Sequence, residues 1–221
     1  MKQQDQRLLI FGATGRTGSL AVDYALEKGI AVVALARHPE KLSPRPNLTL
    51  LSGSPERLDD VQRAITGCTS VLSFLNNMRE SDFPWSKPVS PPRLMATAVS
   101  NAVLAMKENG IRRIVVLSAA GVGDSAASMP WLWGALVRHS NIKHAYADHE
   151  AQEAELRGSG LDWTAVRAVG LSGDKLKRTR ISYDGQPKPR LTISRKQTAT
   201  FMVDCLLHPE FFAKAPVASA E

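Results

Sequence analysis

A glycine-rich loop near the N-terminus constrains the fold of this chain more than any other feature. A short apolar run leads into the sequence GATGRTG at residues 12–18, and a helix-forming segment follows directly. Gly12 permits a tight turn from strand to helix, Gly15 lets the backbone approach a diphosphate, and Gly18 allows the helix to pack closely on the strand. A loop of this kind between a strand and a helix indicates a dinucleotide diphosphate bound at the helix N-terminus.

Strand-length apolar runs alternate with helix-length segments along most of the chain. The predicted strands are Leu8–Ala13, Ala31–Ala36, Leu48–Leu51, Ser70–Leu75, Ile114–Ser118 and Trp163–Val169. The predicted helices are Thr17–Lys28, Pro55–Thr66, Pro92–Asn109 and Lys143–Ser159. Such alternation predicts a Rossmann-type α/β fold, which is a doubly wound, mainly parallel sheet flanked by helices. A length of 221 residues fits a single NAD(P)-binding domain over residues 1–221.

Three segments follow the carboxyl ends of predicted strands and break the alternation. They are about residues 77–93, which are rich in proline, 119–142, which include Trp131 and Trp133, and 170–195, which are basic. Loops at the carboxyl ends of parallel strands border the ligand crevice, so these segments are expected to form the site of a hydride acceptor. The two tryptophans would either form an apolar lid there or pack against the body of the protein.

The positive charge is concentrated in one stretch. The net charge is +7, and residues 171–200 contain eight basic and two acidic side chains, which gives +6 from that stretch alone. Three roles are open for it: a solvated surface, an anionic small-molecule ligand, or nucleic acid. Nucleic acid is disfavoured because Tyr183 is the one aromatic residue between the basic ones, and single strands need several stacking platforms.

Segments for export, membrane insertion or metal binding are not expected. No run approaches the roughly 18 apolar residues that cross a membrane, and the first residues do not have the pattern of a signal peptide. Cys68 and Cys205 match no metal-ligand spacing and indicate reduced thiols. We therefore expect a cytoplasmic protein without a metal, whose oligomeric state the sequence does not indicate.

The end of the second predicted strand carries information about the cofactor. NAD-preferring sites place an Asp or Glu near this position to bind the ribose 2′-hydroxyl, whereas Arg37 stands here. A guanidinium can hold a 2′-phosphate through two hydrogen bonds, and Arg16 in the glycine loop could assist. The residues predict NADP(H) in preference to NAD(H), unless Arg37 is simply an exposed side chain at a strand end.

Five segments carry a family resemblance over residues 7–207: GATGRTG, ALARHPEKL, VVLSAAGV, HEAQEAELRGSGLDWTAVRAVGL and LTISRKQTATFMVDCLL. Together they resemble the atypical short-chain dehydrogenase/reductases of the NAD(P)H-binding type, which include NmrA-like redox sensors and biliverdin reductase B-like flavin reductases. The resemblance implies that the diphosphate is held by Gly12, Thr14, Gly15, Arg16, Thr17 and Gly18. It also implies that Arg37 takes the 2′-phosphate.

Further contacts follow from the same resemblance. The family usually has Gly-Asp near the adenine, whereas this chain has Gly53-Ser54, so a contact there is weaker or made by the backbone. The remaining implied positions are Leu75 and Asn76 beside the ribose, and Ser118 and Val169 beside the nicotinamide.

A conventional proton donor is missing from the expected region. The wider superfamily uses a serine, which Ser118 matches, with a Tyr-x-x-x-Lys pair that protonates an alkoxide. The literal match Tyr24…Lys28 lies behind the glycine loop and is read as coincidence. Tyr146 has Glu150 four residues on, and an anion would raise its pKa. Tyr146 and His149 remain fallback acids, while the alternative makes His144 and His149 surface residues.

The absence of the Tyr-x-x-x-Lys pair favours some of the functions that the resemblance allows over others. Hydride transfer to a flavin, a quinone or a similar conjugated acceptor needs mainly orientation over the nicotinamide. We therefore expect an NADPH-dependent oxidoreductase that acts on a small acceptor, anionic or aromatic in character. Two alternatives are a non-catalytic NADP(H)-sensing regulator and an epimerase- or dehydratase-like enzyme.

Overall fold

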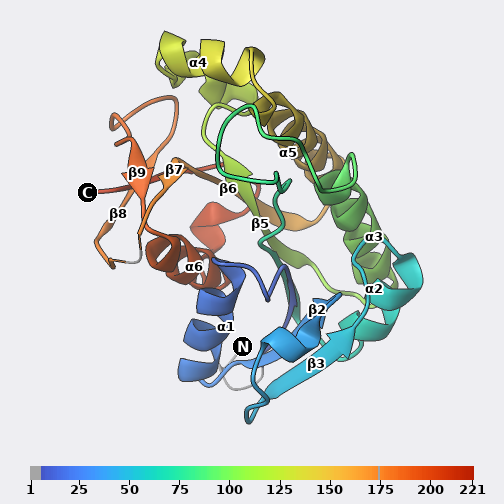
Figure 1. The fold of residues 1–221 in the computed structure, drawn as a ribbon. Helices are drawn as coiled ribbons and strands as arrows, with labels where there is room; N and C mark the ends of the chain where they lie inside the picture. Colours follow the sequence, from blue (N-terminus) through green and yellow to red (C-terminus); the bar gives the residue numbers. More distant parts are fainter. Residues whose placement is uncertain (1–5, 174) are drawn as a thin grey trace.

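A computed structural model describes residues 6–173 and 175–221, which contain one eight-stranded sheet with helices on both faces (Figure 1). Asp174, one of the acidic residues in the basic stretch, lies outside these ranges. The strands of the sheet are β1 (Arg7–Phe11), β2 (Ala31–Ala36), β3 (Leu48–Ser52), β4 (Ser70–Ser73), β5 (Arg113–Ala119), β6 (Asp162–Ala168), β8 (Thr179–Ser182) and β10 (Val217–Ala220).

The strand order is β3-β2-β1-β4-β5-β6-β10-β8, and every neighbouring pair is parallel except β10 and β8. A separate two-stranded sheet joins β7 (Gly170–Leu171) to β9 (Thr192–Ile193). The prediction of a doubly wound, mainly parallel Rossmann-type sheet is confirmed. Because β1 and β4 are neighbours, the strand order reverses between them, and the ligand crevice of such a sheet lies beyond their carboxyl ends.

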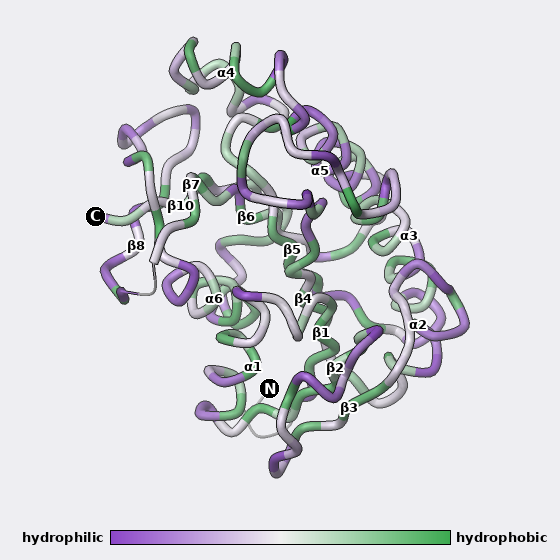
Figure 2. The backbone as a smooth tube through the Cα atoms, in the orientation of Figure 1, coloured by the Kyte–Doolittle hydropathy of each residue, from purple (hydrophilic) through white to green (hydrophobic). Residues whose placement is uncertain are grey.

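Two layers of helices cover the sheet. On one face lie α1 (Gly18–Glu27) and α6 (Arg195–Asp204), and on the other lie α2 (Leu58–Ile65), α3 (Leu94–Glu108) and α5 (Ile142–Arg157) (Figure 1). Successive residues of β1 point to opposite faces, so Leu8 and Ile10 enter the core under α1 while Leu9 and Phe11 enter the other core. All four are buried, and the strands form the hydrophobic centre of Figure 2.

The first and last long helices are tied together. The hydroxyl of Tyr24 on α1 donates to Asp204 on α6 at 3.0 Å, and the Lys28 ammonium lies 5.2 Å from the Tyr24 ring centroid. The literal Tyr24…Lys28 pair is therefore engaged between helices on the far side of the glycine loop from the carboxyl ends of the strands.

Several boundaries and elements differ from the predictions. Helix α2 begins at Leu58 instead of Pro55, α3 begins at Leu94 instead of Pro92, and β4 ends at Ser73 instead of Leu75. Helix α4 (Trp131–Arg138) and the pair β8–β10 were not predicted, because these segments are short and their apolar residues follow no clear period. Short 3₁₀ turns occupy Pro39–Lys41, Gly123–Ser128, Cys205–Leu207 and Pro209–Phe211.

No helix among the described residues is both long and apolar enough to cross a membrane. A cytoplasmic location stays a prediction.

Candidate active site

The glycine loop connects β1 to α1 through direct backbone contact. Gly12 has a φ of +73°, and a Cβ on it would lie 3.0 Å from the Phe74 carbonyl group. A Cβ on Gly18 would lie 2.1 Å from the carbonyl oxygen of Gly12, so no other residue fits there without movement of the backbone. The close packing of helix on strand that the sequence predicts is therefore present.

The end of α1 that faces the crevice offers free hydrogen-bond donors. Among the described residues, no protein acceptor receives the backbone N–H of Thr14, Arg16 or Thr17. Helix α1 has no acidic residue in its first turn and no side-chain cap. Free N–H groups and the positive end of the helix dipole fit the diphosphate of a dinucleotide, which is the cofactor that the loop predicts.

Arg16 links the glycine loop to the proline-rich segment. Its two terminal nitrogens lie 3.2 and 3.3 Å from the Asp82 carboxylate, in an exposed ion pair. The Arg16 guanidinium lowers the pKa of Asp82. Segment 77–93 is thus held against the loop at the mouth of the crevice, which the sequence alone did not reveal.

The predicted contacts for the adenosine half lie at the ends of β2 and β3. Arg37 is exposed directly after β2 and forms no ion pair with a described residue. Gly53 donates its N–H to the Ala36 carbonyl, and Ser54 donates its N–H to the Asp60 carboxylate at 2.9 Å. The hydrogen bond from Ser54 lowers the pKa of Asp60. Since the Ser54 amide is already used, a backbone contact to adenine would have to come from elsewhere.

A cleft of about 590 Å³ lies beside the carboxyl ends of β5 and β6. All three irregular segments contribute to it, through Asp82 from the first, Met129 from the second and Leu191 from the third. Asn76, Ser118 and Val169 also line the cleft, while Leu75 is half-buried next to it. Five cationic side chains stand along its wall and mouth: Arg16, Arg79, Lys188, Arg190 and Arg195.

The hydroxyl of Tyr146 is fully engaged at the wall of this cleft. It donates to the Ala120 carbonyl at 2.9 Å and accepts from the Trp133 indole N–H at 2.9 Å. The pKa of Tyr146 is raised, as predicted, but burial is the cause. Glu150, to which the sequence analysis attributed the shift, is an exposed residue of α5.

The two tryptophans of the second segment have different surroundings. Helix α4 has no buried residue, and Trp131 on it is 77% exposed. Trp133 is partly buried, lines the cleft and holds Tyr146. In Figure 1, α4 stands above the sheet next to α5. The alternative of packing against the body of the protein therefore holds for Trp133, which lies against α5, and not for the exposed Trp131.

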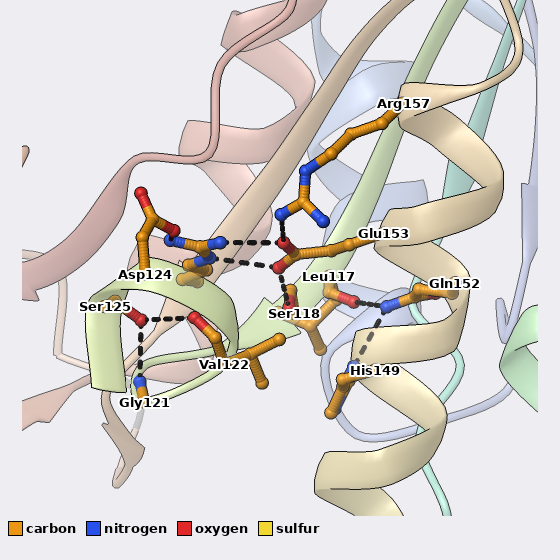
Figure 3. A network of polar contacts seen from close by, with 11 residues as sticks. Leu117, Ser118, Gly121, Val122, Asp124, Ser125, His149, Gln152, Glu153 and Arg157 are labelled. Carbon is orange, nitrogen blue, oxygen red and sulfur yellow. Dashed lines mark hydrogen bonds and ion pairs between the residues drawn. The ribbon is translucent and has the colours of Figure 1, made fainter. Parts of the chain in front are cut away.

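Ser118 is bound to a buried carboxylate. Its hydroxyl donates to Glu153 at 2.7 Å, and both residues are almost completely buried (Figure 3). The same carboxylate receives two hydrogen bonds from Arg167 at 2.8 and 3.0 Å and one from Arg157 at 2.6 Å. Arg167 also pairs with Asp124. The proton of Ser118 is therefore committed to the protein, although its oxygen can still accept a hydrogen bond.

His149 is 3% exposed and lines the cleft. The prediction that it is a surface residue is wrong, whereas His144, five residues earlier, is exposed. The Gln152 side-chain amide lies 2.9 Å from His149 Nδ1 and 2.7 Å from the Leu117 carbonyl oxygen. Burial lowers the pKa of His149 to about 4, so the ring is neutral at pH 7.

Sequence reasoning missed the partners that decide the state of these groups. Gln152 and Glu153 follow His149 by three and four residues, which places all three on one face of α5. That spacing was a usable signal. Arg167 could not be found in this way, because it lies on β6 and reaches Glu153 only through the fold.

The sheet order, the glycine loop and its free amides together define a dinucleotide-binding α/β protein. A family model described as NAD(P)H-binding matches residues 12–209. The chain belongs to this NAD(P)H-binding family, so the predicted family resemblance is confirmed.

Solved structures with the same fold cover nearly the whole chain. A short-chain dehydrogenase/reductase from Veillonella parvula in complex with NADP has a TM-score of 0.76 at 18% identity, covering 97% of this chain and 94% of that one. An anaerobilin reductase from Escherichia coli has a TM-score of 0.77 at 18% identity, covering 97% of both chains.

A curated relative from a plant is more similar in sequence. It is the chloroplastic divinyl chlorophyllide a 8-vinyl-reductase of Cucumis sativus, which is 24% identical over 231 aligned residues and is matched by 92% of this chain. The chain spans about half the length of that enzyme.

Proposed function

We propose that the protein is an NADPH-dependent reductase that transfers hydride to a conjugated acceptor such as a flavin or a quinone. The observation that carries this proposal is the state of Tyr146, whose hydroxyl proton is bonded to a main-chain carbonyl. A ketone reductase needs a proton donor at the substrate oxygen, whereas a conjugated acceptor can take its proton from water after the hydride arrives.

Different residues along the crevice would bind different parts of NADPH. The free amides of the glycine loop would hold the diphosphate, Arg37 the 2′-phosphate, and Asn76 and Val169 the nicotinamide nucleoside. Bound NADPH would supply the hydride. The protein would then contribute binding and orientation, which can supply a large part of a rate enhancement.

The acceptor half of the cleft favours a planar molecule with negative charge. Met129, Pro130 and Trp133 provide apolar surface on one side. Lys188 and Arg190 line the same cleft next to Leu191 on the third irregular segment, and neither forms an ion pair with a described residue. An aromatic ring system with a phosphate or carboxylate would match both features. The relatives named as reductases of a bilin and a chlorophyllide are consistent with this chemistry.

Steady-state NADPH oxidation tests the activity. We expect turnover with flavin mononucleotide or a quinone, and no turnover with simple ketones. Tight NADPH binding without turnover of any acceptor would favour the sensor instead. Turnover of ketones at rates equal to those of quinones would contradict the proposal.

The cofactor preference is tested by substitution of Arg37. We expect Arg37→Ala to weaken NADPH binding by roughly 10- to 100-fold, because a charge-assisted hydrogen bond contributes about 1.5–3 kcal/mol, and to leave NADH binding unchanged. Lys41→Ala is the matched control, since Lys41 is exposed in the same connection. Fluorescence titration measures both affinities. Equal losses for NADPH and NADH would contradict a role at the 2′-phosphate.

A further inference from the structure

A short chain of hydrogen bonds runs from the sheet to the wall of the cleft. It starts at the Leu117 carbonyl on β5, passes through the side-chain amide of Gln152 and ends at Nδ1 of His149 (Figure 3). Gln152 is completely buried and His149 nearly so. Both hydrogens of the amide nitrogen are therefore placed by the fold, and water does not compete for them.

The direction of this chain follows from the chemistry of its first member. A carbonyl oxygen can only accept, so the Gln152 atom 2.7 Å from Leu117 must be its amide nitrogen. That nitrogen has a second hydrogen, which points to His149 Nδ1 at 2.9 Å. Nδ1 must accept it, and a neutral imidazole that accepts at Nδ1 has its hydrogen on Nε2.

The Nε2 atom has no hydrogen bond with a described residue, although the His149 ring lines the cleft. The ionisable groups packed around the ring are already engaged. Glu153 is bonded to Ser118, Arg157 and Arg167, and Asp148 accepts the amides of Met95 and Ala96 at 3.0 Å each. Tyr146 is bonded to Ala120. None of these groups takes the Nε2 hydrogen.

We propose that His149 is a fixed, neutral hydrogen-bond donor, oriented by Gln152, which binds an oxygen atom of the ligand in the cleft and does not exchange a proton. The oxygen is a hydroxyl or carbonyl oxygen, supplied either by the nicotinamide nucleoside of the cofactor or by the acceptor. Gln152 acts as a positioning residue. The kinetic test of this inference rests on the proposed function, whereas the spectroscopic and binding tests do not.

The first test measures the tautomer directly. In ¹⁵N-histidine-labelled protein, we expect the ring nitrogens of His149 to show an unprotonated Nδ1 and a protonated Nε2 between pH 6 and 8. The signals are assigned by elimination, through substitution of the other four histidines, which are all exposed. A protonated Nδ1, or a doubly protonated ring at pH 7, would overturn the proposal. This measurement uses the wild-type protein, so it decides even if a variant fails to fold.

The second test separates a donor from an acid. His149→Gln keeps an N–H near the position of Nε2 but cannot titrate, whereas His149→Leu removes the donor. In either NADPH affinity or kcat/KM, we expect His149→Gln to remain within about threefold of wild type. We expect His149→Leu to lose roughly tenfold in the same quantity, as for an unmade hydrogen bond in a buried site. His144→Leu on the exposed face of α5 is the matched control.

The same variants identify the source of the oxygen. A tenfold loss in NADPH affinity by titration places the contact on the cofactor, and an unchanged affinity with a tenfold loss in kcat/KM places it on the acceptor.

Equal losses in the Gln and Leu variants, or loss of an acidic limb of the pH–rate profile in His149→Gln, would show proton exchange and overturn the proposal. No loss in either variant would also overturn it. Absence of turnover in wild type would reject the proposed function and leave the tautomer and the titration to decide this inference.

Discussion

The two walls of the crevice use hydrogen bonds in opposite ways. At the glycine loop, the amides of Thr14, Arg16 and Thr17 have no acceptor in the described part of the chain, and no described side chain caps the helix. At α5, by contrast, the protons of Ser118, Tyr146 and Gln152 all go to protein groups. One wall is incomplete without an anion, whereas on the other wall these protons are already bonded within the protein and the hydrogen on Nε2 of His149 is left for a ligand.

This difference separates binding from structural support. Free donors in a fixed geometry stabilise an incoming phosphate without rearrangement, because no internal bond has to break first. A saturated network instead holds neighbouring elements together and leaves few groups for chemistry. Substitutions that leave the loop backbone in place are therefore expected to change binding at the cofactor wall, and substitutions in the bonded network of α5 mainly to change stability.

The largest effect is expected at Gly18, where the contact is backbone on backbone. Gly18→Ala places a Cβ within 2.1 Å of the Gly12 carbonyl oxygen, so the loop and helix must separate. We expect a loss of about 5 kcal/mol in the free energy of unfolding, which would leave the chain largely unfolded. Circular dichroism during urea unfolding measures it. Gly134→Ala on α4 has open space around it and should be slightly stabilising, by about 0.5–1 kcal/mol.

A somewhat smaller effect is expected at Glu153 on the other wall. Glu153→Gln leaves the buried Arg167 facing a neutral amide, and breaking a buried ion pair costs about 3–5 kcal/mol. The same unfolding experiment tests this, with Glu150→Gln on the exposed face of α5 as control. A loss of activity at unchanged stability would mean that the network takes part in the chemistry.

A pH effect of about 3 kcal/mol is expected from His149. Its pKa in the folded protein is about 4, below the ordinary value of 6.5. Between these two pH values the unfolded chain binds a proton at His149 that the folded protein does not bind. Stability should therefore fall as the pH drops from 6.5 to 4, by up to about 3 kcal/mol from this group. The difference between wild type and His149→Gln isolates the contribution. Parallel pH profiles for the two proteins would contradict a buried neutral ring.

The smallest effect is expected at Tyr146. Tyr146→Phe removes one hydrogen bond to Ala120 and leaves the Trp133 indole N–H without its acceptor, a loss of about 1–2 kcal/mol in stability. We expect kcat to change by less than about threefold. If Tyr146 were the general acid, kcat would instead fall by about 100-fold or more.

The fold could be predicted from local patterns because parallel strands and their crossover helices are nearly continuous in sequence. Strand β2 is apolar throughout and β1 is apolar after Arg7, which is typical of strands buried on both faces. The β8–β10 pair could not be predicted, since it joins two short segments about 40 residues apart through pairing alone. That residues 1–221 form a single domain stays a prediction.

In the candidate site, too, local motifs could be predicted from the sequence and contacts between distant segments could not. The glycine loop is a local motif, and its geometry follows from Gly12 and Gly18. The states of Ser118 and His149 could not be predicted, because they depend on Glu153, Arg167 and Gln152. Ser118 and Arg167 become neighbours only when β6 pairs with β5, and both then bond to Glu153 on α5. A residue type therefore indicated a candidate, and only its tertiary partners determined what its proton does.

The bond between Tyr24 and Asp204 joins residues that are 180 positions apart, and it has a consequence for the order of events during synthesis. Helix α1 follows the glycine loop directly, yet its apolar face is covered by α6, which is synthesised much later. That face of α1 stays exposed in a nascent chain until α6 has emerged from the ribosome. Domains usually fold as units, so we expect the phosphate loop to become rigid only after α6 has left the ribosome.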